Sequence, residues 1–207
     1  MHISIRTFIP NTLLLMSVLA GTLAVQAQDT QPPQTAVATF AGGCFWCMEP
    51  PYDELDGVLS TTSGYIGGSV PDPSYEQVLT GRTGHAEAVQ VEYDPDRISY
   101  EELLTVFWRN IDPLDVGGQF CDRGSQYRSA IFYHNDRQQQ LAQASRDRLE
   151  EQAGLPGPIV TEIVSAPADE FYRAEDYHQN YYQEHSVRYK FYRWNCGRDE
   201  RLEELWK

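Results

Sequence analysis

The sequence is short of positive charge. Of its 207 residues, 16 are lysine or arginine and 30 are aspartate or glutamate, which gives a formal net charge of −14. Nucleic acids and anionic lipid surfaces attract proteins through clustered cations. This balance therefore argues against both as partners, and beyond that exclusion an acidic surface mainly favours solubility.

Glycine motifs of the dinucleotide or P-loop type that cradle phosphates are missing, as are internal repeats and low-complexity blocks. The four cysteines are too few for a disulfide-dense scaffold. Structural zinc is usually held by two close pairs of ligands, whereas Cys121 and Cys196 each stand alone in the sequence. We therefore expect no nucleotide, flavin or metal cofactor.

The N-terminal apolar run is too short to cross a membrane comfortably, which takes about 20 residues. Residues 13–25 have instead the length of a signal-peptide core, and residues 25–27 offer small side chains for cleavage. We predict a removed signal peptide at 1–27, a polar tether at 28–36 and one folded domain at 37–207. An uncleaved N-terminal anchor is the alternative. Export would place a monomer, free of the membrane after cleavage, in the periplasm, an oxidising compartment.

Strands and helices alternate along the predicted domain. β-prone or alternating runs predict strands, and helical spacing of apolar residues, with cap residues, predicts helices. The expected strands are 37–40, 88–93, 129–134 and 159–164. The expected helices are 45–55 (late or kinked because of two prolines), 100–108 behind a capping box at Ser99–Glu102, 136–153 capped by Asp136, and 198–206.

This order predicts an α+β fold of two layers, with helices packed on a mixed or antiparallel sheet around a ferredoxin-like core. Residues 60–84 are rich in turn residues and are expected to form one long loop. Residues 182–207 are expected to form a coil-rich C-terminal tail that carries Cys196.

The stretch GGCFWCME, residues 42–49, concentrates the chemistry of the chain. The sequence places Cys44 at a strand-to-helix junction, where a helix N-terminus stabilises a thiolate. Cys47 follows one helical turn later and can face it, so the pair is either a structural disulfide or a redox-active pair. Phe45 and Trp46 form an apolar wall that suits a small apolar group such as a methyl.

These residues resemble the active-site signature of the A-type peptide methionine sulfoxide reductases. Further segments resemble blocks of the same family, in the same order, over most of the predicted domain. The blocks are Gly43–Trp46, Gly64–Gly68, Pro73–Tyr75, Gly84–Val89, Phe107–Trp108, Asp122–Ser129 and Ala174–Gln179.

The resemblance implies a reaction and a role for each matching residue. Cys44 would attack the sulfur of methionine S-sulfoxide, free or in proteins, and become a sulfenic acid. The remaining roles are as follows: Phe45 and Trp46 would hold the S-methyl group, Glu87 would give a proton to the sulfoxide oxygen, Tyr75 and Tyr127 would hydrogen-bond that oxygen, and Asp122 would orient the polar side of the pocket.

A second thiol must then resolve the sulfenic acid. Family members often keep a resolving cysteine in the C-terminal segment, which favours Cys196 on a flexible tail, while Cys47 competes because it is nearest in sequence. Cys121 is expected to be a buried, inert thiol. The resemblance implies that thioredoxin or a thioredoxin-like protein reduces the resulting disulfide, in repair of exported proteins. A general thiol-disulfide oxidoreductase built on Cys44 and Cys47 is the alternative function.

Overall fold

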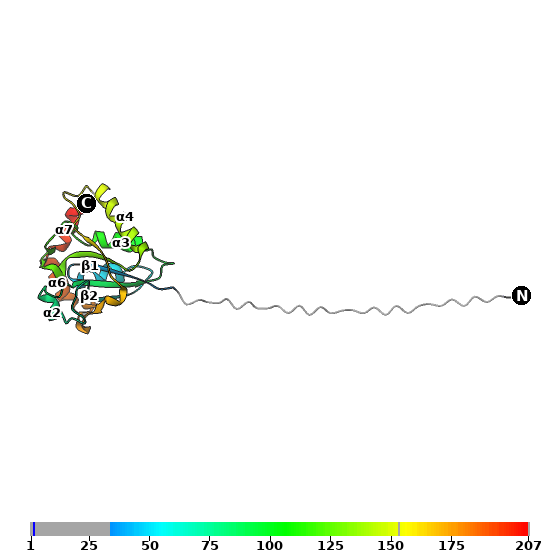
Figure 1. The fold of residues 1–207 in the computed structure, drawn as a ribbon, viewed down its shortest axis with the longest axis horizontal. Helices are drawn as coiled ribbons and strands as arrows, with labels where there is room; N and C mark the ends of the chain where they lie inside the picture. Colours follow the sequence, from blue (N-terminus) through cyan, green and yellow to red (C-terminus); the bar gives the residue numbers. More distant parts are fainter. Residues whose placement is uncertain (1, 3–33, 153, 207) are drawn as a thin grey trace. The chain divides into compact units, whose positions relative to one another are not determined.

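A six-stranded sheet forms the centre of the computed structural model, which describes residue 2 and residues 34–152 and 154–206 (Figure 1). Its strands lie side by side in the order β7-β6-β1-β3-β2-β8. Only the β6–β7 pair is parallel among these strands, so the sheet is mixed. The strands are β1 (Ala36–Gly42), β2 (Val58–Ile66), β3 (Ala86–Tyr93), β6 (Ser129–Tyr133), β7 (Glu162–Ser165) and β8 (Tyr172–Arg173).

Three helices cover one face of this sheet, namely α1 (Glu49–Asp53), α3 (Tyr100–Arg109) and α4 (Asp136–Gln152). Alternate residues of β1, β3 and β6, such as Phe40 and Val89, pack with α3 residues such as Leu103 in the main core. The intervening residues, such as Ala88 and Phe132, form a smaller cluster on the other face. Figure 1 shows α3 and α4 together on one side of β1 and β2. The predicted α+β fold with helices on a mixed sheet is confirmed.

The capping box predicted at the start of α3 is present. The Ser99 hydroxyl accepts a hydrogen bond from the Glu102 backbone N–H, and the Glu102 carboxylate accepts one from the Ser99 N–H. In α4 the predicted cap is wrong by one residue, because Asn135, not Asp136, accepts from the Gln138 N–H. The helix itself begins at Asp136.

Two loop predictions are wrong. The segment expected to be one long loop from residue 60 to 84 contains most of β2 and the short helix α2 (Tyr75–Leu79). Turn residues did mark its bends, but the Gly64–Ile66 stretch pairs with Ala86–Ala88 of β3 as a strand. Gly64 is required in this strand because a Cβ on it would lie 2.4 Å from both the Phe171 Cζ and the Tyr172 carbonyl oxygen.

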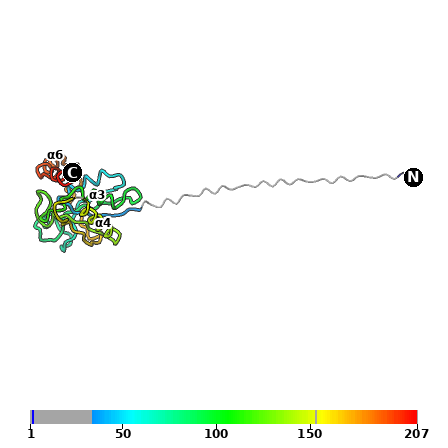
Figure 2. Tube along the Cα trace, turned by 90° about the horizontal axis from the view of Figure 1, so that it is seen from above, coloured from blue at the N-terminus to red at the C-terminus, as the bar shows by residue number. Residues whose placement is uncertain are grey.

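The C-terminal tail is helical rather than coil-rich, although its last helix confirms the one expected over residues 198–206. It folds into α5 (Tyr181–Glu184), α6 (Ser186–Asn195) and α7 (Arg198–Leu205). The Arg198 guanidinium is buried, donates to the backbone oxygens of Gly42 and Asn110, and lies over the Phe120 ring. Figure 2 shows α6 at the margin of the domain. The tail is therefore fixed to the end of β1, not free to swing.

The predicted signal peptide at 1–27 and most of the tether lie outside the described residues, apart from residues 2 and 34–36. In the parts that the structure describes, none of the helices combines the length and the hydropathy that a membrane crossing requires.

Candidate active site

Cys44 follows β1 directly, where the chain makes a sharp turn. Gly43 has φ +85°, a conformation that favours glycine, and a Cβ on it would lie 2.6 Å from the Gln119 Cβ. The chain then enters a single 3₁₀ turn, η1 (Phe45–Cys47), and continues into α1, whose first turn holds Pro50 and Pro51. The predicted junction is present, but its helical part begins as a short 3₁₀ turn.

The prediction that a helix N-terminus holds Cys44 as a thiolate is wrong for the resting site. A three-residue 3₁₀ turn provides little of the dipole that a long helix does, and Cys44 is only 6% exposed. Burial raises the pKa of the Cys44 thiol well above its ordinary value, and its hydrogen bond to Cys47 and the nearby Glu87 and Asp122 carboxyls raise it further. Cys44 is therefore a protonated thiol at neutral pH.

Cys47 is the more readily ionised thiol of the pair. Its sulfur accepts the hydrogen bond from the Cys44 thiol, and this lowers the pKa of Cys47 to about 7 even though burial opposes ionisation. The positive charges of Arg198 and Arg193 lower that pKa further. Both cysteines are free and buried, and Cys44 keeps 6% of its surface exposed.

A cavity of about 90 Å³ brings together the residues predicted from the sequence. It is large enough for a sulfoxide group and its methyl, and too small for a nucleotide or a whole peptide. Its lining consists of Cys44, Phe45, Trp46, Tyr75, Glu87, Asp122, Tyr127 and Tyr192. The seven of these that the sequence pointed to come from four separate segments of the chain, residues 44–46, 75, 87 and 122–127.

Glu87 lies on β3 with its carboxyl group beneath this cavity. It is buried, and its Oε2 accepts a hydrogen bond of 3.2 Å from the Phe45 backbone N–H. Burial raises the pKa of Glu87 to about 8, against the opposing effect of that hydrogen bond. At neutral pH the carboxyl is therefore protonated and able to give up a proton inside the cavity.

Two phenols reach the cavity from different elements. Tyr75 begins α2, and its backbone N–H donates to Glu175 Oε1 at 2.8 Å, which fixes the start of the helix. Tyr127 ends the 3₁₀ turn η2 (Ser125–Tyr127). Burial, followed by the charge of Glu87, raises the pKa of both phenols. Both are neutral O–H donors.

Tyr192 is a cavity residue that the sequence analysis did not identify. It lies on α6, and its hydroxyl donates to Asp122 Oδ2. Burial raises the pKa of Asp122 even though this hydrogen bond and Arg198 act in the opposite direction. Its distance in sequence from the other cavity residues left no local signal.

His178 is the second missed residue, and it lies behind the aromatic wall. It is buried in the 3₁₀ turn η4 (Asp176–His178), and its ring contacts those of Phe45, Trp46 and Tyr75 at centroid distances of 4.9, 5.7 and 4.3 Å. Its Nδ1 accepts from the Trp46 indole N–H at 3.2 Å. Burial lowers the pKa of His178 to about 4, so the ring is neutral.

Other tyrosines of the C-terminal segment act in packing around Trp46 and Cys47. Tyr181 stacks on the Trp46 indole at 3.7 Å with the planes 8° apart. Tyr189 packs against Cys47. Trp46 is thus held between a stacked phenol and the His178 hydrogen bond, which fixes one side of the cavity.

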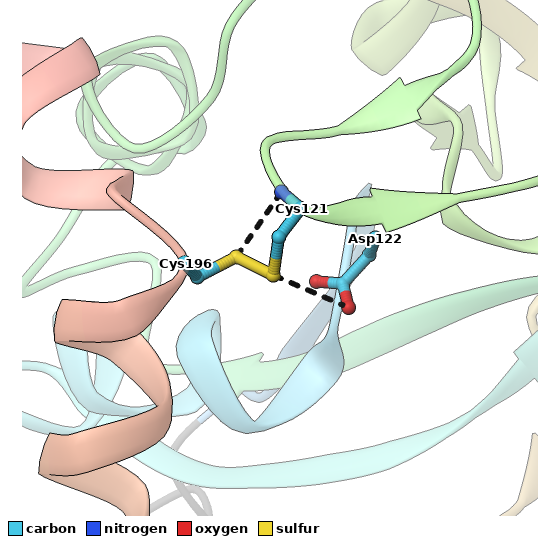
Figure 3. A group of neighbouring side chains, drawn as sticks. All are labelled: Cys121, Asp122 and Cys196. Atoms are coloured by element: carbon cyan, nitrogen blue, oxygen red, sulfur yellow. Dashed lines mark hydrogen bonds between the residues drawn. A yellow bond between two sulfur atoms is a disulfide. The ribbon is translucent and has the colours of Figure 1, made fainter.

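Cys121 and Cys196 form a disulfide, which corrects both sequence predictions for Cys121 (Figure 3). Cys121 is exposed rather than buried, and it is bonded rather than inert. The bond joins the end of α6 to the turn between the short strands β4 (Gly118–Gln119) and β5 (Asp122–Arg123). Cys196 is therefore not a free thiol beside Cys44 in this state.

The disulfide also bears on metal binding. The sulfurs of Cys121 and Cys196 and an Asp122 oxygen lie within 4.8 Å of one another, a spacing that suits a metal ion. Metal ligation by cysteine requires thiolates, and here the two sulfurs are bonded to each other. In this oxidised state the group does not offer a thiolate ligand set.

Comparisons with known proteins agree with this geometry. The family model for peptide methionine sulfoxide reductase matches residues 36–207. The peptide methionine sulfoxide reductase MsrA of Bacillus subtilis is 52% identical over 170 residues, covering 82% of this chain and 95% of that protein. The chain therefore belongs to the peptide methionine sulfoxide reductase family.

Solved structures show the same fold. Mxr1 from Saccharomyces cerevisiae in reduced form has a TM-score of 0.67 and 34% identity, covering 74% of this chain and 87% of that one. A crystal structure of Mxr1 in complex with Trx2 matches with a TM-score of 0.50 and 27% identity, covering 73% and 87% of the two chains.

Proposed function

We propose that this protein is a peptide methionine sulfoxide reductase of the A type, which reduces methionine S-sulfoxide, free or in proteins, to methionine. The cavity carries the proposal, because it brings a thiol, a protonated carboxyl, two phenols and an aromatic wall to one small space. A sulfoxide sulfur is a poor electrophile until its oxygen is protonated or strongly hydrogen-bonded. Glu87, Tyr75 and Tyr127 supply those groups.

In the first step the Cys44 sulfur attacks the sulfoxide sulfur while Glu87 gives its proton to the sulfoxide oxygen. The Cys47 thiolate, which already accepts the Cys44 hydrogen bond, takes the proton that Cys44 loses. The S–O bond of the substrate breaks, methionine leaves, and the oxygen remains on Cys44 as a sulfenic acid. Phe45 and Trp46 hold the methyl group in place, and Asp122 and Tyr192 close the polar side.

Cys47 is the thiol that lies beside Cys44, so we assign it the next step. It attacks the Cys44 sulfenic acid, water leaves, and a Cys44–Cys47 disulfide forms. This reverses the preference for Cys196 drawn from the sequence. Cys196 is bonded to Cys121 on a fixed helix, and it takes a later part in the cycle.

Both inner cysteines are buried, whereas Cys121 is exposed. A protein reductant therefore has access to the Cys121–Cys196 disulfide and not to the inner pair. We infer that a thioredoxin-like protein reduces the outer disulfide, and that the resulting thiols reduce the inner one by exchange. The structure of Mxr1 with Trx2 supports a thioredoxin as the reductant. We further propose that the protein is exported and acts in the periplasm as a monomer. Its substrates there would be other exported proteins whose methionines have been oxidised.

The test counts methionine without any reductant. Protein that has been fully reduced and freed of reductant is mixed with a methionine sulfoxide peptide, and the methionine formed per protein is measured. We expect two equivalents, since four thiols form two disulfides. No methionine at all would contradict the proposed function.

A general thiol-disulfide oxidoreductase built on Cys44 and Cys47 is disfavoured by the same burial. A protein disulfide cannot approach sulfurs at the bottom of a cavity of about 90 Å³. Insulin reduction by the protein, at a rate that survives Glu87→Gln, would support that alternative.

A further inference from the structure

The outward face of α6 is unusually apolar for a surface helix. Val187, Phe191 and Trp194 are 83%, 63% and 73% exposed, and their spacing places them on one side of the helix. They are three of the seven large apolar side chains that are exposed in the described residues. Phe191 and Trp194 also contact each other, with ring centroids 6.0 Å apart. A contiguous exposed patch of this kind marks an interaction surface.

The helix beneath this face is firmly held. On its inward side Tyr189 is buried beside Cys47, and Tyr192 lines the active-site cavity. Arg193 bonds to Asp199 of α7. α6 is therefore already packed against the domain through its inward side. Its outward face is exposed on a helix that is held in place.

The face lies beside the exposed disulfide. Trp194 precedes Cys196 by two residues, Cys196 is the C-cap residue directly after α6, and its sulfur is bonded to Cys121. Thiol–disulfide exchange requires an attacking thiolate to reach a disulfide sulfur. A protein seated on Phe191 and Trp194 would bring its own thiol to that bond.

The charge of this surface differs from that of the rest of the chain. Residues 185–198 contain four arginines or lysines and no acidic residue, in a chain of net charge −14. Arg188 and Lys190 are exposed on α6. The patch therefore suits a partner whose contact face is apolar with a neutral or acidic rim.

We propose that the outward face of α6 (Val187, Phe191 and Trp194, flanked by Arg188 and Lys190) is the docking surface for a thioredoxin-type dithiol protein that reduces the Cys121–Cys196 disulfide. The proposal rests on the recycling step of the proposed function. One partner thiolate attacks a sulfur of the pair, the S–S bond breaks, and the released thiolate takes a proton. The second partner thiol then attacks the mixed disulfide. Two electrons pass to the pair, and the partner leaves as a disulfide.

The test measures reduction of the disulfide directly, with no sulfoxide present. Reduced thioredoxin, supplied with its reductase and NADPH, is mixed with the oxidised full-length protein, and the free thiols of Cys121 and Cys196 are quantified over time. Dithiothreitol, which needs no docking surface, is the parallel reductant. Because no methionine sulfoxide is used, loss of the proposed activity and loss of docking give separate results.

The decisive variant is Phe191→Ser with Trp194→Ser. We expect kcat/KM for thioredoxin to fall by about tenfold or more, as when aromatic anchors leave an interface. The rate with dithiothreitol should stay within about twofold, as for ordinary surface substitutions. Leu59→Ser, at an apolar side chain 46% exposed outside α6, is the matched control and should change neither rate.

A second variant tests the charge. Arg188→Ser with Lys190→Ser should slow thioredoxin at low salt and converge with the wild type at high salt, because exposed charges are screened beyond about 10 Å at 0.1 M. Arg137→Ser on α4, an exposed arginine elsewhere, is its control.

Three results would overturn the proposal. One is an unchanged thioredoxin rate in Phe191→Ser with Trp194→Ser. Another is a parallel fall with both reductants, which would mean that the substitutions act on the disulfide itself. The third is a change from dimer to monomer in size-exclusion chromatography with no change in the thioredoxin rate, which would make a second copy of this chain the occupant of the face.

Discussion

The two cysteine pairs of this chain have opposite surroundings. Cys44 and Cys47 are free, buried, and placed next to a protonated carboxyl and two arginines. Cys121 and Cys196 are bonded to each other at the surface, beside an exposed apolar helix face. The inner pair has the acid and the methyl-sized cavity that sulfoxide chemistry needs. The outer pair has the access that a protein reductant needs. Burial and neighbours, not the identity of the residue, divide these tasks.

Replacing Cys44 should have the largest effect. Cys44→Ser removes the attacking sulfur, and we expect no methionine from the pre-reduced protein in the stoichiometric assay. The control Cys121→Ser with Cys196→Ser keeps the inner pair and should still give one equivalent. Methionine formed by Cys44→Ser would mean that another thiol is the nucleophile.

Replacing Glu87 should slow the first step but leave the cysteines in place. Glu87→Gln removes the proton donor, and general acid catalysis contributes about 100- to 10,000-fold. The single-turnover rate of methionine formation measures this. Alkylation of Cys44 by iodoacetamide in the same variant is the control, since a large change there would indicate damage to the pocket rather than loss of the acid.

The rate of that first step should rise and then fall as the pH is increased. The folded-state pKa of Glu87 lies at about 8, so its proton, and with it the rate, should be lost as pH rises through that value. The pKa of Cys47 at about 7 gives a rising limb, because its thiolate accepts the Cys44 proton. In Glu87→Gln the falling limb should disappear. A wild-type rate that stays flat up to pH 9 would refute the assignment.

Cys47→Ser and Cys196→Ser should separate the two pairs during turnover. Cys47→Ser should form the first methionine and then accumulate the Cys44 sulfenic acid, detected by dimedone labelling. Cys196→Ser should still form the inner disulfide but lose thioredoxin-driven turnover while dithiothreitol supports it. If Cys196→Ser accumulates the sulfenic acid and Cys47→Ser does not, Cys196 is the direct resolving cysteine.

The outer disulfide should also contribute to stability. It closes a long segment of chain between residues separated by 75 positions, and such a link is typically worth about 2–4 kcal/mol. Denaturant unfolding of Cys121→Ser with Cys196→Ser should show a loss of this size relative to the oxidised wild type. Reduced wild type should match the variant, and a difference between those two would point to an effect of serine itself.

The smallest effect is expected at His178, a positioning residue behind the inner pair. His178→Phe keeps an aromatic ring but removes the acceptor for the Trp46 N–H, a hydrogen bond worth about 0.5–1.5 kcal/mol. We expect KM for the sulfoxide to rise by about 2- to 10-fold while kcat changes little. Phe45→Leu is the control variant, because it alters the aromatic wall of the cavity but leaves the Trp46–His178 hydrogen bond in place. If His178→Phe lowered kcat by as large a factor as it raised KM, the substitution would have disrupted the site as a whole.

Much of the fold could be predicted from local patterns. The alternation at Val89 and Val91 marks β3, and the Ser99–Glu102 capping box marks the start of α3. The loop expected from 60 to 84 and the coil expected after 182 were wrong, since neither β2 nor α6 stands out in its own sequence. Both are stabilised by partners that are distant in the chain, β3 for one and Cys47 with Cys121 for the other.

By itself the sequence determined the order of the central elements and seven of the eight residues that line the cavity, because family blocks and apolar spacing are local properties. Only the tertiary structure decided which sulfur is charged, which cysteines are bonded and which helix face is left uncovered. Those properties depend on burial and on neighbours brought from other parts of the chain. The Cys44 thiol keeps its proton because residues of β3, α6 and the β4–β5 hairpin bury it. That burial cannot be predicted from residues 42–49 alone.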